Sequence, residues 1–379
     1  MSNISSSSTS FALDLFSTLS RSQPGGNIFV SPLSISSALA MVYLGARGET
    51  AAQMEKGLSL GSGGNVHADF QTLNADINSP AASYTLKLAN RLYGEATANF
   101  LSTFLQDTEK FYQADLKTLD FLGNPESCRE EINGWVEQQT HNKIKDLLQP
   151  GSVRSSTRLA LVNAIYFKGN WKNRFDAAST QEMTFKINQN ETKPVQMMYQ
   201  MKKLPYNYVP ELGLQILELP YVDEELSMFI LLPEETEDGS DPLIKLEKEL
   251  TAERLQEWTL RDNMDVHSEV LVHLPRFRLE QDYELNEPLA RLGVTDLFSA
   301  RADLSGMSGD GGLYLSTVVH KAFVEVNEEG TEAAAATAGM VAFCMLREEH
   351  FTADHPFLFF IQHNKTRTIL FLGRFSSPQ

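Results

Sequence analysis

The chain has 379 residues, of which 42% are hydrophobic and 21% are charged, so it can bury a large core and is not disordered throughout. Its 32 basic and 49 acidic side chains give a formal net charge of −17 at pH 7. Such an acidic excess disfavours binding to nucleic acid and to anionic membrane surfaces. We therefore expect no nucleic acid and no membrane among the partners.

The N-terminal segment, residues 1–10, is rich in serine and lacks Lys and Arg, so no cleavable signal peptide is visible. The longest apolar run, residues 38–44, is far shorter than the ~20 residues that span a bilayer. Two cysteines, Cys128 and Cys344, indicate no disulfide framework and fit a reducing compartment. We expect a cytoplasmic monomer, with release without a signal peptide as an alternative.

Helical patterns dominate the first 150 residues. The first helix places an apolar stripe on one face: Phe11, Leu15, Phe16 and Leu19. A second helix starts at Pro32 and stops at Gly45, and its nearly uncharged, alanine-rich composition predicts burial on all sides. A third has Asn124 as its predicted cap and Pro125 in its first turn, with a polar outer face that predicts a surface position.

Strand patterns take over from about residue 158. Residues 159–167 are almost continuously apolar, as in a central strand covered on both faces, and Asn163 is the exception that needs hydrogen-bond partners. Further predicted strands are residues 84–93, 214–219, 226–232, 269–277, 313–326, 357–362 and 368–371. Early helices and late strands predict an α+β class. Because the apolar final strands must join the interior, we expect one large domain over residues 1–379.

The sequence contains no catalytic motif of a known type, so we do not expect an enzyme. The glycine-rich residues 306–312 have the wrong spacing for phosphate binding and predict a plain loop. One acidic and histidine cluster has no metal-ligand spacing and is interpreted as a solvated charge run: Glu348, Glu349, His350, Asp354 and His355. We expect neither a metal nor a cofactor.

Residues 328–346 (EEGTEAAAATAGMVAFCML) are the most informative stretch. By propensity alone, the four alanines favour a short helix. As a strand, the same residues place only small uncharged groups on one face: Thr331, Ala333, Ala335, Thr337 and Gly339. Such a face can be buried between two existing strands without a clash or an unpaired charge. Gly330, directly before it, is a natural hinge.

At this point the sequence resembles the serpin family over essentially its whole length, and in particular the intracellular, ovalbumin-like branch (clade B). The resemblance is carried by residues 27–35 (NIFVSPLSI), 161–171 (LVNAIYFKGNW), 217–221 (LELPY), 273–277 (HLPRF), 303–306 (DLSG), 320–337 (HKAFVEVNEEGTEAAAAT), 353–359 (ADHPFLF) and 371–375 (FLGRF). It implies a serpin fold with three β-sheets and eight or nine helices. It also implies a metastable, five-stranded central sheet and an exposed reactive-centre loop at about residues 328–350.

The resemblance also implies roles for residues of this loop. The proximal hinge comprises Glu328, Glu329, Gly330, Thr331, Glu332, Ala333, Ala334, Ala335, Ala336 and Thr337. Counting seventeen residues from Glu328 places the primary specificity residue at Cys344, with cleavage before Met345. Phe343 precedes it. A small thiol suits an elastase-type pocket and a phenyl ring suits a chymotrypsin-type pocket.

Other positions match the family's control of sheet opening. Ser31, Ser34, Asn163 and His320 match a polar cluster beneath the opening, and Trp171 and Glu328 match the group where the loop first enters. For each position, structural stabilisation is an equal alternative to a gating role. Residues 66–78 contain no Lys or Arg, so the basic helix of heparin-activated members is absent.

The leading hypothesis is a suicide inhibitor that forms a covalent complex with elastase-like and chymotrypsin-like serine proteases of the neutrophil type. The alternative is a non-inhibitory serpin that acts as a binding or storage protein with a helical loop. The small residues on the inserting face favour the first hypothesis.

Overall fold

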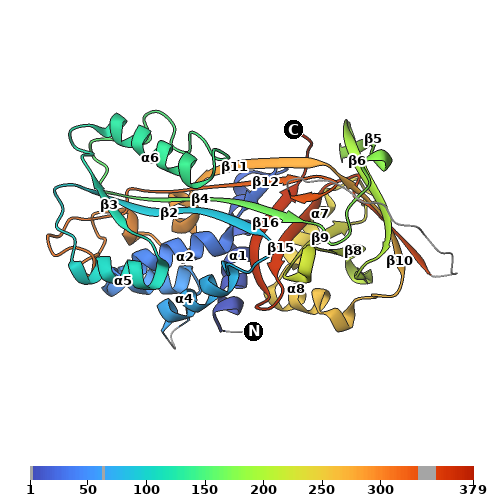
Figure 1. The fold of residues 1–379 in the computed structure, drawn as a ribbon, viewed down its shortest axis with the longest axis horizontal. Coiled ribbons are helices and arrows are strands. Elements are labelled where there is room, and N and C mark those ends of the chain that lie inside the picture. Colours follow the sequence, from blue (N-terminus) through green and yellow to red (C-terminus); the bar gives the residue numbers. More distant parts are fainter. Residues whose placement is uncertain (1–2, 62–64, 332–346) are drawn as a thin grey trace.

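The computed structural model describes residues 3–61, 65–331 and 347–379, and in these residues the chain combines helices with three β-sheets (Figure 1). The described helices are α1 (Asn3–Ser22), α2 (Pro32–Tyr43), α3 (Gly48–Gly57), α4 (Val66–Ile77), α5 (Ser102–Tyr112), α6 (Pro125–Gln139), α7 (Pro242–Glu249), α8 (Ala252–Thr259) and α9 (Asn286–Arg291). The predicted α+β class, with three sheets and eight or nine helices, is confirmed, and the described residues contain nine α-helices.

The sheet that we call the central sheet has the strand order β11-β12-β4-β2-β3, and a two-residue strand, β13, pairs with β4 beside this path. Its strands are β2 (Thr85–Glu95), β3 (Leu116–Leu119), β4 (Leu159–Asn170), β11 (Phe277–Glu284), β12 (Thr317–Val326) and β13 (Gly330–Thr331). The five strands of the main path agree with the expected five-stranded arrangement.

The other two sheets are named here the inner sheet and the end sheet. The inner sheet comprises β1 (Ile28–Val30), β16 (Thr368–Phe375), β15 (Phe357–His363), β9 (Leu226–Pro233), β8 (Leu214–Pro220) and β7 (Tyr206–Val209), in that order. The end sheet comprises β14 (Glu348–Thr352), β10 (Glu269–Pro275), β6 (Glu191–Lys203) and β5 (Gln181–Asn188).

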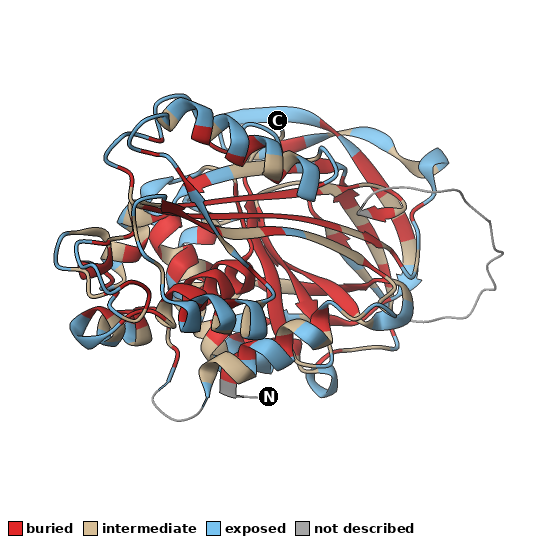
Figure 2. Cartoon of the chain, turned by 60° about the vertical axis from the view of Figure 1, so that its left-hand side comes forward, coloured by how far each residue is buried: buried red, intermediate tan, exposed pale blue. Residues whose placement is uncertain are grey.

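The two faces of the central sheet are covered differently, as Figures 1 and 2 show. The larger core lies on the side of α1, α2 and the inner sheet. A smaller core lies between α6 and the opposite face, where Ile132 and Val136 of α6 pack with Val162 of β4. Strand β4 thus buries both of its faces, which explains its continuous apolar run and confirms the predicted covered strand.

Helix α2 is buried along almost its entire length, as predicted. Ser31 is its N-cap and accepts a hydrogen bond from the Ser34 amide, and Pro32 occupies the first turn. The helix packs against both β16 and β4. It therefore brings its first turn beneath the middle of the central sheet.

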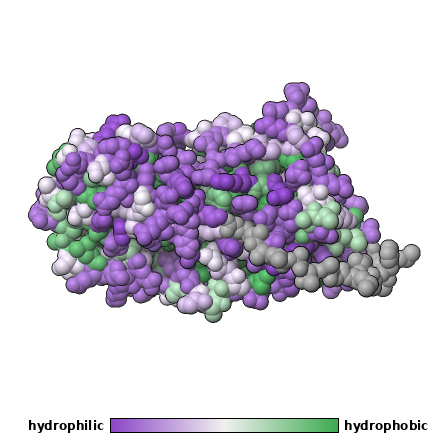
Figure 3. Space-filling model, turned by 45° about the horizontal axis from the view of Figure 1, so that its top comes forward, coloured by the Kyte–Doolittle hydropathy of each residue, from purple (hydrophilic) through white to green (hydrophobic). Residues whose placement is uncertain are grey.

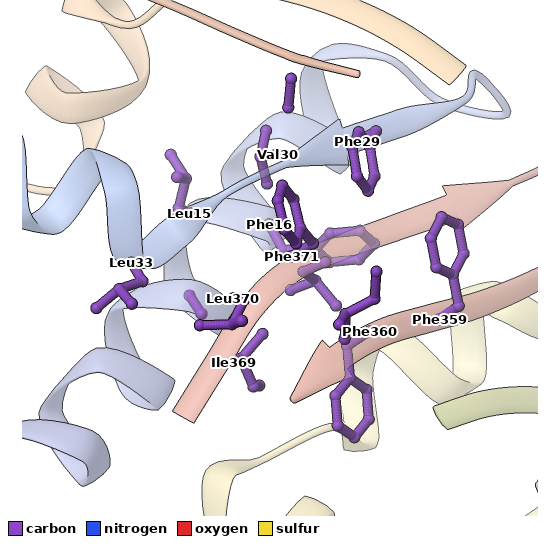
Figure 4. Close-up of a cluster of buried hydrophobic side chains, with 14 of the residues drawn as sticks. Leu15, Phe16, Phe29, Val30, Leu33, Phe359, Phe360, Ile369, Leu370 and Phe371 are labelled. Atoms are coloured by element: carbon purple, nitrogen blue, oxygen red, sulfur yellow. The ribbon is translucent and has the colours of Figure 1, made fainter. Parts of the chain in front are cut away.

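The C-terminal strands β15 and β16 lie inside the inner sheet, which confirms that the end of the chain joins the interior. Figure 4 shows their aromatic side chains among residues from the start of the chain. Phe371 stacks on Phe29 with ring centroids 5.3 Å apart, and Phe29 also stacks on Phe359. Such aromatic pairs add to the free energy of burial.

Asn124 occupies the N-cap position of α6 and Pro125 its first turn, as predicted, but the Asn124 side chain makes no capping bond and instead donates to Asp120 Oδ2 at 2.9 Å. One strand boundary was predicted wrongly. The strand predicted from residue 313 begins only at Thr317, because the preceding backbone bonds elsewhere: the Leu315 amide donates to the Leu297 carbonyl.

Candidate functional site: the hinge and the seam of the central sheet

Strands β4 and β12 form a parallel pairing that we call the seam. It runs from Thr317 opposite Ala160 to Phe323 opposite Tyr166. Beyond this point β4 continues to Asn170, but its partner there is β13. The seam therefore ends before the sheet does, and the sheet is open at the end where the chain leaves β12.

The chain reverses direction directly after β12. The Asn327 amide donates to the Gly330 carbonyl at 2.9 Å, and β13 then runs antiparallel to β4, with Gly330 opposite Asn170 and Thr331 opposite Gly169. Gly330 has φ +138°, and a Cβ there would lie 2.3 Å from the Gly169 carbonyl oxygen. This close approach requires glycine at the position predicted as a hinge, and the hinge role itself stays a prediction.

Glu328 and Glu329, in the turn after β12, differ in how their side chains are paired. Glu328 is 9% exposed, and its carboxylate accepts a hydrogen bond of 2.7 Å from Thr180 Oγ1 and lies 3.5 Å from the Arg276 guanidinium. The Glu329 carbonyl accepts from the Trp171 amide at 2.8 Å, but its Oε2 atom is buried without a hydrogen-bond partner. Burying an unpaired polar atom costs free energy, so Glu329 destabilises the turn.

Trp171 follows β4 directly and is 1% exposed. Its indole Nε1 donates to the Asn327 carbonyl at 3.0 Å, and its ring stacks on Tyr221 with centroids 4.5 Å apart. The ring therefore joins the turn after β12 to Tyr221, the residue that follows β8 of the inner sheet.

Ser31, Ser34, Asn163 and His320 form one buried hydrogen-bonded group, called here the polar cluster. Asn163 of β4 and His320 of β12 face each other in the register of the seam, and His320 Nδ1 lies 2.7 Å from Asn163 Oδ1. Asn163 also exchanges two hydrogen bonds with the Ser34 hydroxyl, at 2.7 and 3.0 Å. Through these hydrogen bonds, the cluster connects both strands of the seam to the first turn of α2.

The protonation of His320 follows from its partners. The Ser31 amide donates to Nε2 at 3.1 Å, so Nε2 accepts and Nδ1 carries the proton that is donated to Asn163. Complete burial lowers the pKa of His320 to about 3. The ring is therefore neutral at physiological pH, and the cluster contains no buried charge.

The reactive-bond residues Phe343, Cys344 and Met345, and the hinge residues Glu332, Ala333, Ala334, Ala335, Ala336 and Thr337, lie outside the described residues. The chain is described again from residue 347, where β14 pairs with β10 in parallel. The two ends of the loop thus belong to different sheets: β13 lies in the central sheet and β14 in the end sheet.

The acidic and histidine cluster is not a uniformly solvated charge run. Glu348 and His350 are exposed on β14, but His355 is largely buried and bridges Asp354 and the Pro233 carbonyl, at 2.8 and 2.6 Å. The ring thereby anchors the chain between β14 and β15. Within the described part of the chain, no group of His, Cys, Asp or Glu is arranged to hold a metal ion.

Sequence analysis missed three partners of the turn: Thr180, Arg276 and Asn327. Arg276 had a weak signal, since it is a single charge between the apolar residues Pro275 and Phe277, and it lies exposed between β10 and β11. Thr180 had none, because it follows a short 3-10 helix far away in sequence.

A model of the serpin (serine protease inhibitor) family matches residues 6–378. The chain is a serpin. Human leukocyte elastase inhibitor is 59% identical to this serpin over 380 residues, and the Xenopus laevis leukocyte elastase inhibitor is 55% identical over 380 residues; each alignment covers 100% of both chains. The resemblance to the serpin family, drawn from the sequence motifs, is thereby confirmed.

Solved structures agree with the fold. Uncleaved ovalbumin superposes with a TM-score of 0.90 at 38% identity, covering 99% of this serpin and 100% of ovalbumin. Human thyroxine-binding globulin complexed with its ligand superposes with a TM-score of 0.89 at 30% identity, covering 99% of this serpin and 98% of the globulin.

The described helices of this serpin include none that is long and apolar enough to cross a membrane. The face of the molecule shown in Figure 3 is largely hydrophilic.

Proposed function

We propose that this serpin is a suicide inhibitor of serine proteases with elastase-like and chymotrypsin-like specificity. The observation that carries the proposal is the position of β13. Its two residues already pair antiparallel with β4 at the open end of the seam, where an inserted strand has to begin. The residues that follow Thr331 in the sequence continue the small-residue face that burial requires.

In the proposed reaction, the serine hydroxyl of the protease attacks the carbonyl carbon of Cys344 or of Phe343. The peptide bond to the next residue breaks, the leaving nitrogen takes a proton, and the acyl group remains on the protease as an ester. The new end of the loop is then free to move. This serpin supplies the substrate bond and no catalytic group.

Insertion separates β4 from β12 and places the loop between them as a new strand. If this adds on the order of a dozen backbone hydrogen bonds at ~0.5–1.5 kcal/mol each, the net gain is roughly 6–18 kcal/mol before side-chain burial. That free energy is available to carry the tethered protease across the molecule and to distort its active site before water cleaves the ester. The uncut protein must persist through a kinetic barrier.

Target specificity is proposed from the two residues before Met345. The small Cys344 side chain suits a narrow pocket, and the Phe343 ring suits a deep one. The named relatives are inhibitors of leukocyte elastase, which supports an elastase-like target. We further propose that this serpin acts as a single-domain monomer in the cytoplasm or after release, without catalytic activity, a cofactor, nucleic acid or a membrane.

The second candidate is a non-inhibitory binding or storage protein, and the similarity to thyroxine-binding globulin in complex with a ligand keeps this candidate open. The test mixes this serpin with an elastase-type or a chymotrypsin-type protease and analyses the mixture by denaturing electrophoresis. Inhibition predicts an adduct that survives boiling, and mass spectrometry of the released peptide identifies the cleaved bond. Cleavage with full recovery of protease activity would instead support the binding protein.

A further inference from the structure

A second candidate site lies away from the seam, in a groove between α4, the end of α5, β2 and the end of α6. It has a volume of about 800 Å³, within the range of small-molecule sites. Figure 1 shows α4, α5 and β2 close together at the side of the molecule that is remote from the end sheet. The groove is made entirely of described residues.

Amide side chains dominate the polar lining of this groove. They come from all of its walls and include Gln71, Asn74, Asn90, Gln113, Gln138 and Gln139. No carboxylate lines the groove, and its basic residues are Lys87 and His141. Each amide both donates and accepts hydrogen bonds, so this lining matches a ligand that carries many hydroxyl groups.

One of these amides has an unsatisfied buried atom. Asn90 Oδ1 is buried without a hydrogen-bond partner, whereas Gln71 and Asn74 donate to the Lys110 carbonyl and to the Ser37 hydroxyl. A buried polar atom without a partner is uncommon in folded proteins, and because Oδ1 is closed off from solvent, the Asn90 amide has to turn towards the groove before a bound hydroxyl can satisfy it. Asn90 is thus the polar group most in need of a ligand.

The groove also offers apolar surface next to these amides. Phe111 and Tyr112 line it from α5, and Leu88 of β2 is 40% exposed within it. Flat apolar faces beside hydrogen-bonding amides suit a sugar ring, which has an apolar face and a rim of hydroxyls.

We infer that this groove binds a neutral oligosaccharide. An anionic ligand fits less well, because α4 contains no Lys or Arg and the chain carries a net charge of −17. The inference does not depend on the proposed protease inhibition, since none of the groove residues belongs to the hinge, the seam or the reactive bond.

Binding here has a consequence for the central sheet. Asn90 lies opposite Asn163 in the register of β2 and β4, and Ser37, one turn after Ser34 of the polar cluster, lines the groove. A ligand whose hydroxyl donates a hydrogen bond to Asn90 Oδ1 would therefore link β2 to the helices beside the polar cluster. The ligand stabilises the uncut form to the extent that it binds this form more tightly than the opened sheet.

The test uses maltotriose and N,N′-diacetylchitobiose as probes with the full chain. Saturation-transfer NMR is expected to detect binding of at least one of them, with a dissociation constant in about the millimolar range. Leu88→Glu, which places a charge in the groove, is expected to weaken binding by about tenfold. Gln139→Ala, at an exposed position, is the second variant, used if Leu88→Glu fails to fold, and is expected to weaken binding by about threefold.

Gln181→Ala, an exposed amide on edge strand β5 outside the groove, is the matched control and should bind as the unmodified protein does. The inference is overturned if neither probe binds. It is also overturned if Gln139→Ala and Gln181→Ala bind equally well, or if a heparin tetrasaccharide binds more tightly than both neutral probes.

Discussion

In the middle of the seam, every polar side-chain atom of the polar cluster has a hydrogen-bond partner and the only titratable ring is neutral. At the hinge end of the same strands, Glu329 Oε2 and Asn170 Oδ1 are buried without partners. Hydrogen bonds therefore stabilise the middle of the seam, whereas the unpaired buried oxygens at its hinge end destabilise the closed sheet. This difference fits the proposed mechanism, in which the sheet stays closed until the loop is cut and then opens from one end.

The largest expected effect comes from blocking insertion at the hinge end. In Thr331→Arg, an arginine on the inserting face would have to be buried unpaired, which costs several kcal/mol. We expect the variant to be cleaved as a substrate, with adduct formation reduced by at least about tenfold relative to Thr331→Val. Persistent adduct formation by Thr331→Arg on a denaturing gel would contradict the insertion geometry.

Breaking the polar cluster should loosen the middle of the seam. Asn163→Ala leaves the His320 Nδ1–H group and the Ser34 hydroxyl without their partner, and we expect a loss of about 2–4 kcal/mol in the free energy of unfolding. Urea denaturation of the uncut protein measures it. The matched control is Asn190→Ala, at an exposed position of the β5–β6 hairpin, where the loss should be below about 0.5 kcal/mol.

Some residues of the seam and the hinge could be predicted from local sequence patterns, and others only from the family resemblance. Asn163 was recognised because an amide interrupts an apolar strand, and Gly330 because a hinge needs backbone freedom. The resemblance supplied Ser31, Ser34, His320 and Trp171. Local patterns did not reveal the register that places His320 opposite Asn163, since pairing between distant strands is set by the packing of the whole sheet.

The same limit explains the failures. The Asn124 side chain is drawn away from its helix by Asp120, a competition between local hydrogen bonds that residue preferences do not resolve. The unpartnered atoms of Glu329 and Asn170 depend on the arrangement of three strands and a turn. A sequence pattern predicts that a segment is able to insert, but only the packing shows which end of the seam contains buried polar atoms without hydrogen-bond partners.

Acid should weaken the middle of the seam through His320. Its pKa is lowered from 6.5 to about 3 on folding, so between these values the unfolded state binds a proton that the folded state does not. The stabilisation is complete above about pH 6.5 and is lost as pH falls towards 3, with a slope of about 1.4 kcal/mol per pH unit from this group.

Burial also lowers the pKa of His67 to about 4, so its contribution overlaps with that of His320. The measurement is the pH dependence of the free energy of unfolding in the unmodified protein and in His320→Gln. The slope of the variant should be smaller by about 1.4 kcal/mol per pH unit between pH 4 and 6. Equal slopes would show that His320 does not remain neutral through this range.

The smallest effect has the opposite sign, and it separates two adjacent glutamates. Glu329→Ala removes a buried unpartnered oxygen and should stabilise the uncut protein by about 1 kcal/mol. Glu328→Ala removes the acceptor of Thr180 and the partner of Arg276, and should destabilise it by about 1 kcal/mol. Thermal unfolding of the two variants measures both changes under identical conditions.

A lower melting temperature in both variants would show that the hinge end is fastened like the middle, and the contrast along the seam would be lost. If the signs are opposite, the rate of adduct formation provides the next step. Glu329→Ala should form the adduct more slowly than the unmodified protein, because removing the unfavourable contact lowers the free energy of the closed sheet but not that of the inserted one.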